Sequence, residues 1–105
     1  NYAFHNSQFL ESVEMSDSVT SIGMYAFSWC SSLKSVKLSK SIKEIPSGMF
    51  NYCTSLTDVV IPNSVKNIGG YAFYSCKSLT EITIPNGVTI INYYTFSKRY
   101  NLTIK

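Results

Sequence analysis

The sequence contains a single histidine, a single tryptophan and only three cysteines. Charged residues make up 14% of the chain, and the formal net charge is +3. This charge is well below the strongly basic balance typical of nucleic-acid-binding domains. No apolar run approaches the roughly 18 residues that a membrane-spanning helix needs. We therefore expect neither a nucleic-acid partner nor insertion into a membrane.

The sequence also lacks an initial methionine and any recognisable signal segment. It begins with "NYAF", a stretch that falls in the middle of a repeat described below. Its hydrophobic content of 45% is typical of a folded domain rather than a disordered tail. We interpret residues 1–105 as a single array of about four and a half repeat units, cut from a longer protein.

Histidine and acidic residues, the usual bases of hydrolytic sites, are scarce. A nucleophilic cysteine or serine needs a base nearby, and the only histidine is His5, in the first partial repeat. No combination of nucleophile, base and orienting group stands out along the chain. We therefore predict no catalytic residues, no cofactor and no enzymatic activity.

Apolar residues instead recur at a fixed interval of 23 positions. Phenylalanine occupies positions 4, 27, 50, 73 and 96, and leucine occupies positions 10, 33, 56, 79 and 102. Four further apolar columns keep the same step, including Val36, Val59 and Ile82. A fixed period of 20–29 residues with a Leu-x-x-Leu-x-Leu core is typical of a leucine-rich solenoid, in which each repeat forms one rung.

Within one rung, Val59 and Ile61 alternate with polar or exposed positions, as in a strand with one buried face. The pattern predicts parallel strands at Leu33–Leu38, Leu56–Ile61 and Leu79–Ile84, all in one sheet. Pro62 ends its strand, because proline has no N–H for the ladder. The stretch Gly70–Cys76 is expected to form a turn of helix that carries Phe73 into the core.

The repeat resembles the BspA-like leucine-rich repeat family over essentially the whole chain. The resemblance lies in "LTDVVIPNSVKNIGGYAF" (56–73) and "CKSL" (76–79). It implies a leucine-rich repeat solenoid of right-handed 23-residue rungs. A parallel β-sheet would form the concave face, with short extended and helical turns on the other side.

The family resemblance also implies a function and a location. Members are associated with adhesion and with binding of host or matrix proteins, and most are cell-surface or secreted proteins. The leading hypothesis is a non-enzymatic protein-binding or adhesion module. The alternative is an intracellular interaction scaffold in the cytoplasm, because free cysteines suit a reducing compartment.

The sequence departs from the repeat at several positions. Ser16 and Ser39 stand where later rungs have Pro62 and Pro85, so the early rungs lack a proline to end the strand. Arg99 replaces the cysteine of earlier rungs, which resembles the charged last rung that covers the end of an array. We expect that end to be better covered than the other, where Val13, Met15, Val19 and Ile22 face a side with no partner. Pro46 shares a column with Gly23 and Gly69, which predicts negative φ at both glycines.

The cysteine column, Cys30, Cys53 and Cys76, allows three interpretations. Zinc requires about four ligands around one ion, and rungs about 4.8 Å apart place the outer sulfurs too far from each other. A disulfide between neighbouring rungs fits the Cα spacing, but stacked side chains run parallel. The pattern favours three reduced, buried thiols, and no metal site.

Lysines recur at Lys34, Lys37, Lys40 and Lys43. Taken alone, this stripe is typical of a phosphate or heparin site. The repeat step, however, places acidic residues of the preceding rung beside three of them: Glu11, Glu14 and Asp17. We therefore favour a ladder of exposed ion pairs between rungs, each worth about 0–1 kcal/mol.

Two surfaces are candidates for ligand binding. Outward positions of the predicted strands vary in chemistry while the buried columns barely change, and they suit a protein or peptide ligand: Ser35, Lys37, Asp58, Val60, Glu81 and Thr83. The rival surface is an aromatic flank composed of Trp29, Tyr52, Tyr71 and Tyr94. Aromatic side chains make good contacts at low entropic cost, but we favour packing between rungs as the explanation of this flank.

Overall fold

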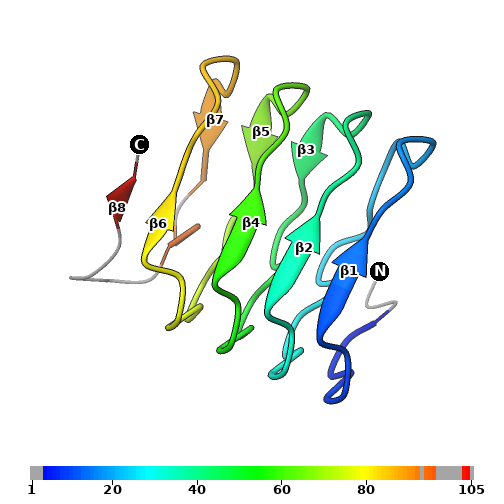
Figure 1. Cartoon of the computed structure of the whole chain (residues 1–105). Helices are drawn as coiled ribbons and strands as arrows, with labels where there is room; N and C mark the ends of the chain where they lie inside the picture. Colours follow the sequence, from blue (N-terminus) through cyan, green and yellow to red (C-terminus); the bar gives the residue numbers. More distant parts are fainter. Residues whose placement is uncertain (1–3, 93, 97–102, 105) are drawn as a thin grey trace.

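The computed structural model describes residues 4–92, 94–96 and 103–104. Short strands form two rows that lie one behind the other (Figure 1). The front row contains β1 (Ser12–Glu14), β2 (Ser35–Lys37), β4 (Asp58–Val60) and β6 (Glu81–Ile82). The rear sheet contains β3 (Glu44–Ile45), β5 (Asn67–Ile68) and β7 (Ile90–Ile91). The last strand, β8 (Thr103–Ile104), pairs with β6.

All of these strand pairs are parallel. In the front row Val36 lies opposite Val59, and in the rear sheet Ile45 lies opposite Ile68. Both pairs join residues 23 positions apart, the separation also seen in side-chain bonds between rungs. The three strands predicted from the sequence start and end within two residues of β2, β4 and β6. Their parallel orientation in neighbouring rungs is therefore confirmed for β2 and β4.

The prediction of one continuous sheet is wrong at β6. The front ladder runs β1-β2-β4, whereas β6 pairs with β8. Thr57 N–H donates to Lys34 O at 3.0 Å, but among the described residues no equivalent bond joins Thr80 N–H to Thr57 O. The rear sheet is continuous between the same two rungs, where Thr89 N–H donates to Lys66 O at 2.9 Å. Because β6 has only two residues, the interruption between β4 and β6 costs few backbone hydrogen bonds.

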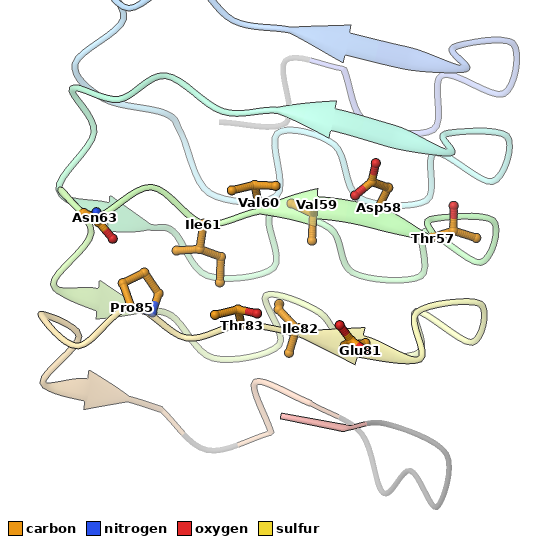
Figure 2. A pocket seen from close by; sticks show the side chains of 10 residues that line it. All are labelled: Thr57, Asp58, Val59, Val60, Ile61, Asn63, Glu81, Ile82, Thr83 and Pro85. Carbon is orange, nitrogen blue, oxygen red and sulfur yellow. The ribbon is translucent and has the colours of Figure 1, made fainter. Parts of the chain in front are cut away.

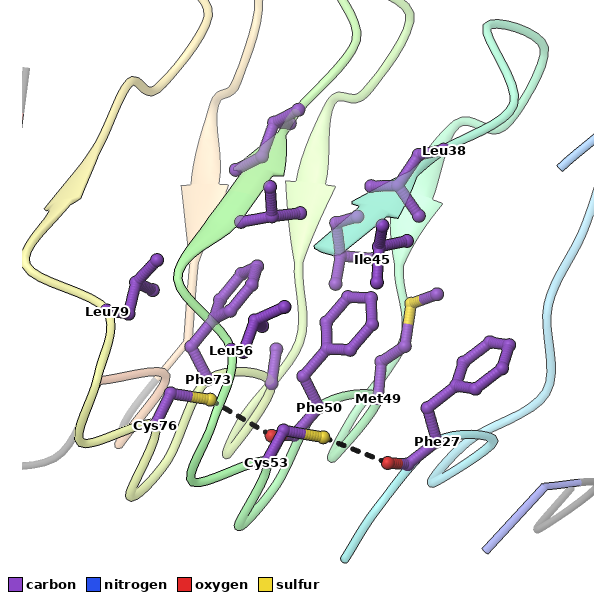
Figure 3. Close-up of a cluster of buried hydrophobic side chains, with 14 of the residues drawn as sticks. Phe27, Leu38, Ile45, Met49, Phe50, Cys53, Leu56, Phe73, Cys76 and Leu79 are labelled. Atoms are coloured by element: carbon purple, nitrogen blue, oxygen red, sulfur yellow. Dashed lines mark hydrogen bonds between the residues drawn. The ribbon is translucent and has the colours of Figure 1, made fainter. Parts of the chain in front are cut away.

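The core fills the space between the two rows. Its centre is a stack of phenylalanine rings, with centroids 6.0 Å apart for Phe27 and Phe50 and 5.5 Å apart for Phe50 and Phe73. Phe50 is completely buried, and so are Leu33 and Ile68, which come from different rungs. Figure 3 shows these columns side by side. Each side chain therefore packs mainly against the same position of the next rung, as expected of a repeat protein.

The segment that carries the phenylalanines is not a helical turn, contrary to the sequence prediction. Tyr71 and Ser75 have positive φ angles of 62° and 58°, which an α-helix does not allow. The same alternation recurs in the other rungs, at Asn6, Tyr25, Trp29, Gly48, Tyr52 and Tyr94. It aims alternate N–H groups at the next rung, so that Phe50 N–H donates to Ala72 O and Phe73 N–H to Thr95 O. Bonds between rungs replace the bonds that a helix would form within itself.

The glycine prediction is confirmed. Gly48 is the one glycine with positive φ in the described part of the chain, so Gly23 and Gly69 lie outside the left-handed region. A Cβ at Gly69 would lie 2.8 Å from the carbonyl carbon of Pro46. Glycine is therefore required at position 69 for clearance, because the backbone of the preceding rung passes too close for any side chain.

Serine hydroxyls close the turns that lack proline. Ser39 is completely buried, donates to Val19 O at 2.6 Å and accepts the N–H of Ser41 at 3.1 Å. Ser16 Oγ accepts the N–H of Ser18 in the same way at 3.2 Å. Short polar side chains commonly stabilise turns by bonding their own backbone two residues on. The early rungs therefore end their strands by a different device from the later, proline-containing rungs.

The side chains at the start of the array are half-buried and pack against the core: Val13, Met15, Val19 and Ile22. This is less burial than the equivalent residues of the next rung have, where Val36 and Leu38 are buried. Arg99, predicted to cover the opposite end, lies outside the described residues. Which end is better covered therefore stays a prediction.

Candidate functional site

The outward positions of β1, β2, β4 and β6 form one surface, which we call the front face. Val60 is 71% exposed, while its neighbour Val59 points into the core and is 8% exposed. Of the six residues predicted to bind a ligand, Ser35 is half-buried and five are exposed: Lys37, Asp58, Val60, Glu81 and Thr83. Register places Lys37 directly opposite Val60, and Ser35 opposite Asp58. The structure therefore brings these residues onto one side of the array.

A first hollow in the front face lies between the rungs of β2 and β4, and we call it the basic hollow. Its volume is about 670 Å³. Lys37 and Lys40 line one side, while Val60 and Pro62 provide an apolar wall. Among the described residues neither lysine ammonium forms an ion pair. The hollow is therefore suited to a negatively charged group next to an apolar one.

A second hollow, of about 520 Å³, lies between the rungs of β4 and β6 (Figure 2), and we call it the acidic hollow. It is where the front ladder is interrupted. Asp58 and Glu81 supply its charge, Thr83 adds a hydroxyl, and Val60 and Pro85 are its apolar members. No lysine or arginine of the described chain lines it. It is therefore suited to a positively charged group.

The predicted ladder of ion pairs is not formed. Glu14 lies opposite Lys37 as expected, but no ion pair joins them in the part of the chain that the structure describes. Asp17 uses its carboxylate to accept the backbone N–H of Lys40 at 3.0 Å. The prediction was correct about register and wrong about the contact, because exposed side chains gain little from pairing in water.

The aromatic flank is continuous. Trp29 and Tyr52 stack with ring centroids 4.2 Å apart, and Tyr71 and Tyr94 stack at 5.5 Å. Tyr74, which the sequence did not single out, joins the two pairs through edge contacts with Tyr52 at 5.7 Å and Tyr71 at 5.2 Å. Each of these rings therefore contacts at least one other ring, while Trp29, Tyr71 and Tyr94 are still 47%, 41% and 58% exposed.

The three cysteines are free and completely buried. Cys53 Sγ donates to Phe27 O at 3.0 Å and Cys76 Sγ to Phe50 O at 3.1 Å (Figure 3). Cys30 makes the same bond to Phe4 O at 3.2 Å. Burial raises the pKa of the Cys53 thiol strongly, and the neighbouring thiols add to this effect. Burial also raises the pKa of Cys30. The prediction of buried, reduced thiols agrees with this geometry.

A serine–histidine contact also occurs, between His5 Nδ1 and Ser28 Oγ at 2.5 Å. Ser28 is completely buried and donates to Tyr25 O. A nucleophile must reach its substrate, so this pair is structural rather than catalytic. Within the described residues no group of three His, Cys, Asp or Glu side chains could hold a metal ion, and no helix there is long and apolar enough to cross a membrane.

Sequence reasoning missed two features of the site. Lys40 was assigned to an ion-pair ladder, yet it lines the basic hollow beside Lys37. The opening between β4 and β6 was not expected either, because every repeat column continues across it. The spacing of the lysines could have indicated the basic hollow. Nothing in the repeat pattern indicated the interruption between β4 and β6.

Comparison with known protein families gives one match that spans the chain. The model for the BspA type leucine rich repeat region matches residues 1–104 in 6 copies. No curated protein matches the chain.

Three solved structures are similar. A leucine-rich repeat protein from Bacteroides ovatus is 33% identical, with a TM-score of 0.91 over 98% of this chain and 27% of that one. A leucine rich cell surface protein from Faecalibacterium prausnitzii is 32% identical, with a TM-score of 0.79 over 95% of this chain and 29% of that one. A leucine-rich repeat protein from Eubacterium ventriosum is 25% identical, with a TM-score of 0.67 over 91% and 33%. The chain thus spans about a third or less of the length of these proteins.

Proposed function

Because the chain belongs to the BspA-type leucine-rich repeat family, we propose that it is a non-enzymatic protein-binding module. Leucine-rich repeat domains generally mediate protein–protein interactions. The proposed parent is a longer cell-surface or secreted protein with an adhesive role. The similarity to a cell surface protein of Faecalibacterium prausnitzii supports this location.

The proposed ligand is a protein or peptide that lies on the front face. The observation that carries this proposal is the contrast along each strand: Val36 and Val59 are buried and are the same residue type, while Lys37 and Val60 are exposed and differ. In this proposal the rungs wind right-handed and the front face is concave. Such faces hold side chains at fixed spacing and are the usual binding surface of repeat arrays.

The structure gives no reason to favour an intracellular scaffold. That alternative rested on the free cysteines, which suit a reducing compartment. All three thiols are buried and bonded to carbonyl groups, and burial raises the pKa of Cys30 and Cys53. Thiolate formation and access control thiol reactivity, so these thiols would persist in an oxidising environment as well. The cysteines therefore no longer discriminate between the two locations.

The test compares the two candidate surfaces. Purified matrix proteins such as collagen, fibronectin and laminin are immobilised, and binding of the chain is measured by biolayer interferometry. The front-face variant Lys37→Glu/Asp58→Lys is compared with the flank variant Trp29→Ala/Tyr52→Ala. We expect the front-face variant to lose binding and the flank variant to keep it.

A matched control carries the same pair of charge reversals on another surface. Lys43 and Glu44 are both exposed, at the start of β3 in the rear sheet. The variant Lys43→Glu/Glu44→Lys should bind as the unmodified chain does. Loss of binding in the flank variant alone, with an unchanged circular dichroism spectrum, would move the site to the aromatic flank.

A further inference from the structure

The front face carries two hollows of opposite charge that share one exposed apolar residue. Lys37 and Lys40 line the basic hollow, whereas Asp58 and Glu81 line the acidic hollow. Val60 belongs to both and is 71% exposed. A ligand that covers Val60 therefore meets positive charge on one side and negative charge on the other.

The arrangement is unsuited to a polyanion. A sulfated polysaccharide or nucleic acid requires a surface of one sign. Asp58 and Glu81 occupy the rungs directly after the lysines, and Glu14 lies opposite Lys37 on the other side. These carboxylates would repel an extended polyanion on both sides of the lysines. A ligand with charges of both signs fits the surface better.

The spacing fits an extended peptide. Hydrogen-bonded strands are about 4.8 Å apart, so Val60 lies one such step from Lys37. Glu81 lies one rung further, across the interruption of the front ladder, which places its rung at least about 10 Å from Lys37. Glu81 is also displaced along its strand, since the 23-residue repeat aligns it with Asp58 rather than with Val60. In an extended peptide, alternate side chains on one face are about 6.6 Å apart. Three such side chains span about 13 Å, which is similar to the separation between Lys37 and Glu81.

We propose that the front face binds an extended peptide segment in which an acidic, an apolar and a basic side chain occupy alternate positions. The acidic side chain enters the basic hollow beside Lys37 and Lys40. The apolar side chain covers Val60, and the basic side chain reaches Asp58 and Glu81 in the acidic hollow. This inference rests on the proposed function and specifies the chemistry of its ligand.

The experiment titrates the isotope-labelled chain with blocked peptides and follows its backbone amides by NMR. The probe is Ser-Glu-Ser-Leu-Ser-Lys-Ser. Three companion peptides replace its lysine by glutamate, its glutamate by lysine, or its leucine by alanine. We expect the probe to shift the amides of Lys37, Val60 and Glu81. Each companion should bind about five-fold more weakly, the effect of losing one modest contact.

Charge reversal of the basic hollow provides the decisive comparison. In the variant Lys37→Glu/Lys40→Glu both hollows are acidic, so the probe should weaken while the peptide with two lysines should bind more tightly. The control is Lys43→Glu/Lys66→Glu, which changes the net charge equally at exposed residues preceding the rear strands. In the control the order of the four peptides should stay as it is in the unmodified chain.

Two results would overturn the inference. One is equal binding of all four peptides, and the other is a peptide preference that does not change in Lys37→Glu/Lys40→Glu. If no peptide shifts the front face but the Lys37→Glu/Asp58→Lys variant still loses a matrix protein, the ligand chemistry is wrong and the proposed function stands. If only the flank variant loses that protein, the front-face function itself is wrong.

Discussion

The ring of Tyr25 occupies the space that a side chain at position 48 would need. A Cβ built on Gly48 would lie 2.7 Å from Tyr25 Cζ, too close for any contact between unbonded atoms. Gly48 also has a φ angle of 66°, similar to the 62° of Tyr71 in the next rung. The tyrosine column is therefore interrupted at Gly48 because Tyr25 fills that position from the preceding rung.

Replacing Gly48 with alanine should lower the free energy of unfolding by about 2–4 kcal/mol. Left-handed φ costs a non-glycine residue about 1–2 kcal/mol, and the clash with Tyr25 adds an overpacking cost of similar size. Urea denaturation measures the loss. In a Tyr25→Ala background the same replacement should cost only about 1 kcal/mol. An equal cost in both backgrounds would show that the ring moves away freely.

The phenylalanine stack should depend most on its middle members. Phe50 is completely buried between Phe27 and Phe73, so Phe50→Ala should cost about 3–5 kcal/mol. Phe4 stacks in the same column but is 51% exposed, and Phe4→Ala should cost less than half as much. Chemical denaturation of the two variants tests this order. Similar losses at both positions would contradict the described burial.

The hydroxyl of Ser39 should stabilise the fold where later rungs have proline. Ser39→Ala removes the bonds to Val19 O and from Ser41 N–H inside a buried site, which should cost about 1–3 kcal/mol. Ser16→Ala removes the equivalent turn bond at an exposed position and should cost less than about 0.5 kcal/mol. Thermal and urea unfolding of both variants measure the difference.

Stability should fall at alkaline pH through Cys53. Burial raises the pKa of this thiol above its ordinary value of 9.0, so the folded chain holds a proton that the unfolded chain releases. The stabilisation is complete below pH 9 and is lost as the pH rises above it. At pH 10 the loss from this group should be about 1.4 kcal/mol. Urea denaturation of the unmodified chain and of Cys53→Ala between pH 8 and 10 isolates it, because other titrating groups are common to both.

The cysteines should react only after unfolding. Each thiol is buried and bonded to a phenylalanine carbonyl, so alkylation of the folded chain should be slow. Mass spectrometry of protein prepared without reductant should show three alkylated cysteines in denaturant and almost none before it. Recovery of a single alkylated cysteine would show that two neighbouring thiols are bridged.

The sequence alone determined which residues form the core and how the rungs align. Val36, Val59 and Ile82 recur at one interval, and a buried position tolerates little change because the next rung packs directly on it. The same interval placed Glu14 beside Lys37 before any contact was known. Register, burial and the choice of outward residues are therefore readable from the repeat.

The tertiary structure decided what the repeat cannot encode. Tyr25 and Trp29 adopt left-handed backbone angles that their side chains do not favour. Their N–H groups donate to Ser47 O and Asn51 O of the next rung, and Trp29 also stacks on Tyr52. The front ladder opens between β4 and β6 although every column continues across that gap. The acidic hollow lies at this interruption. Such features depend on how neighbouring rungs pack against each other. The residues of a single rung do not determine that packing.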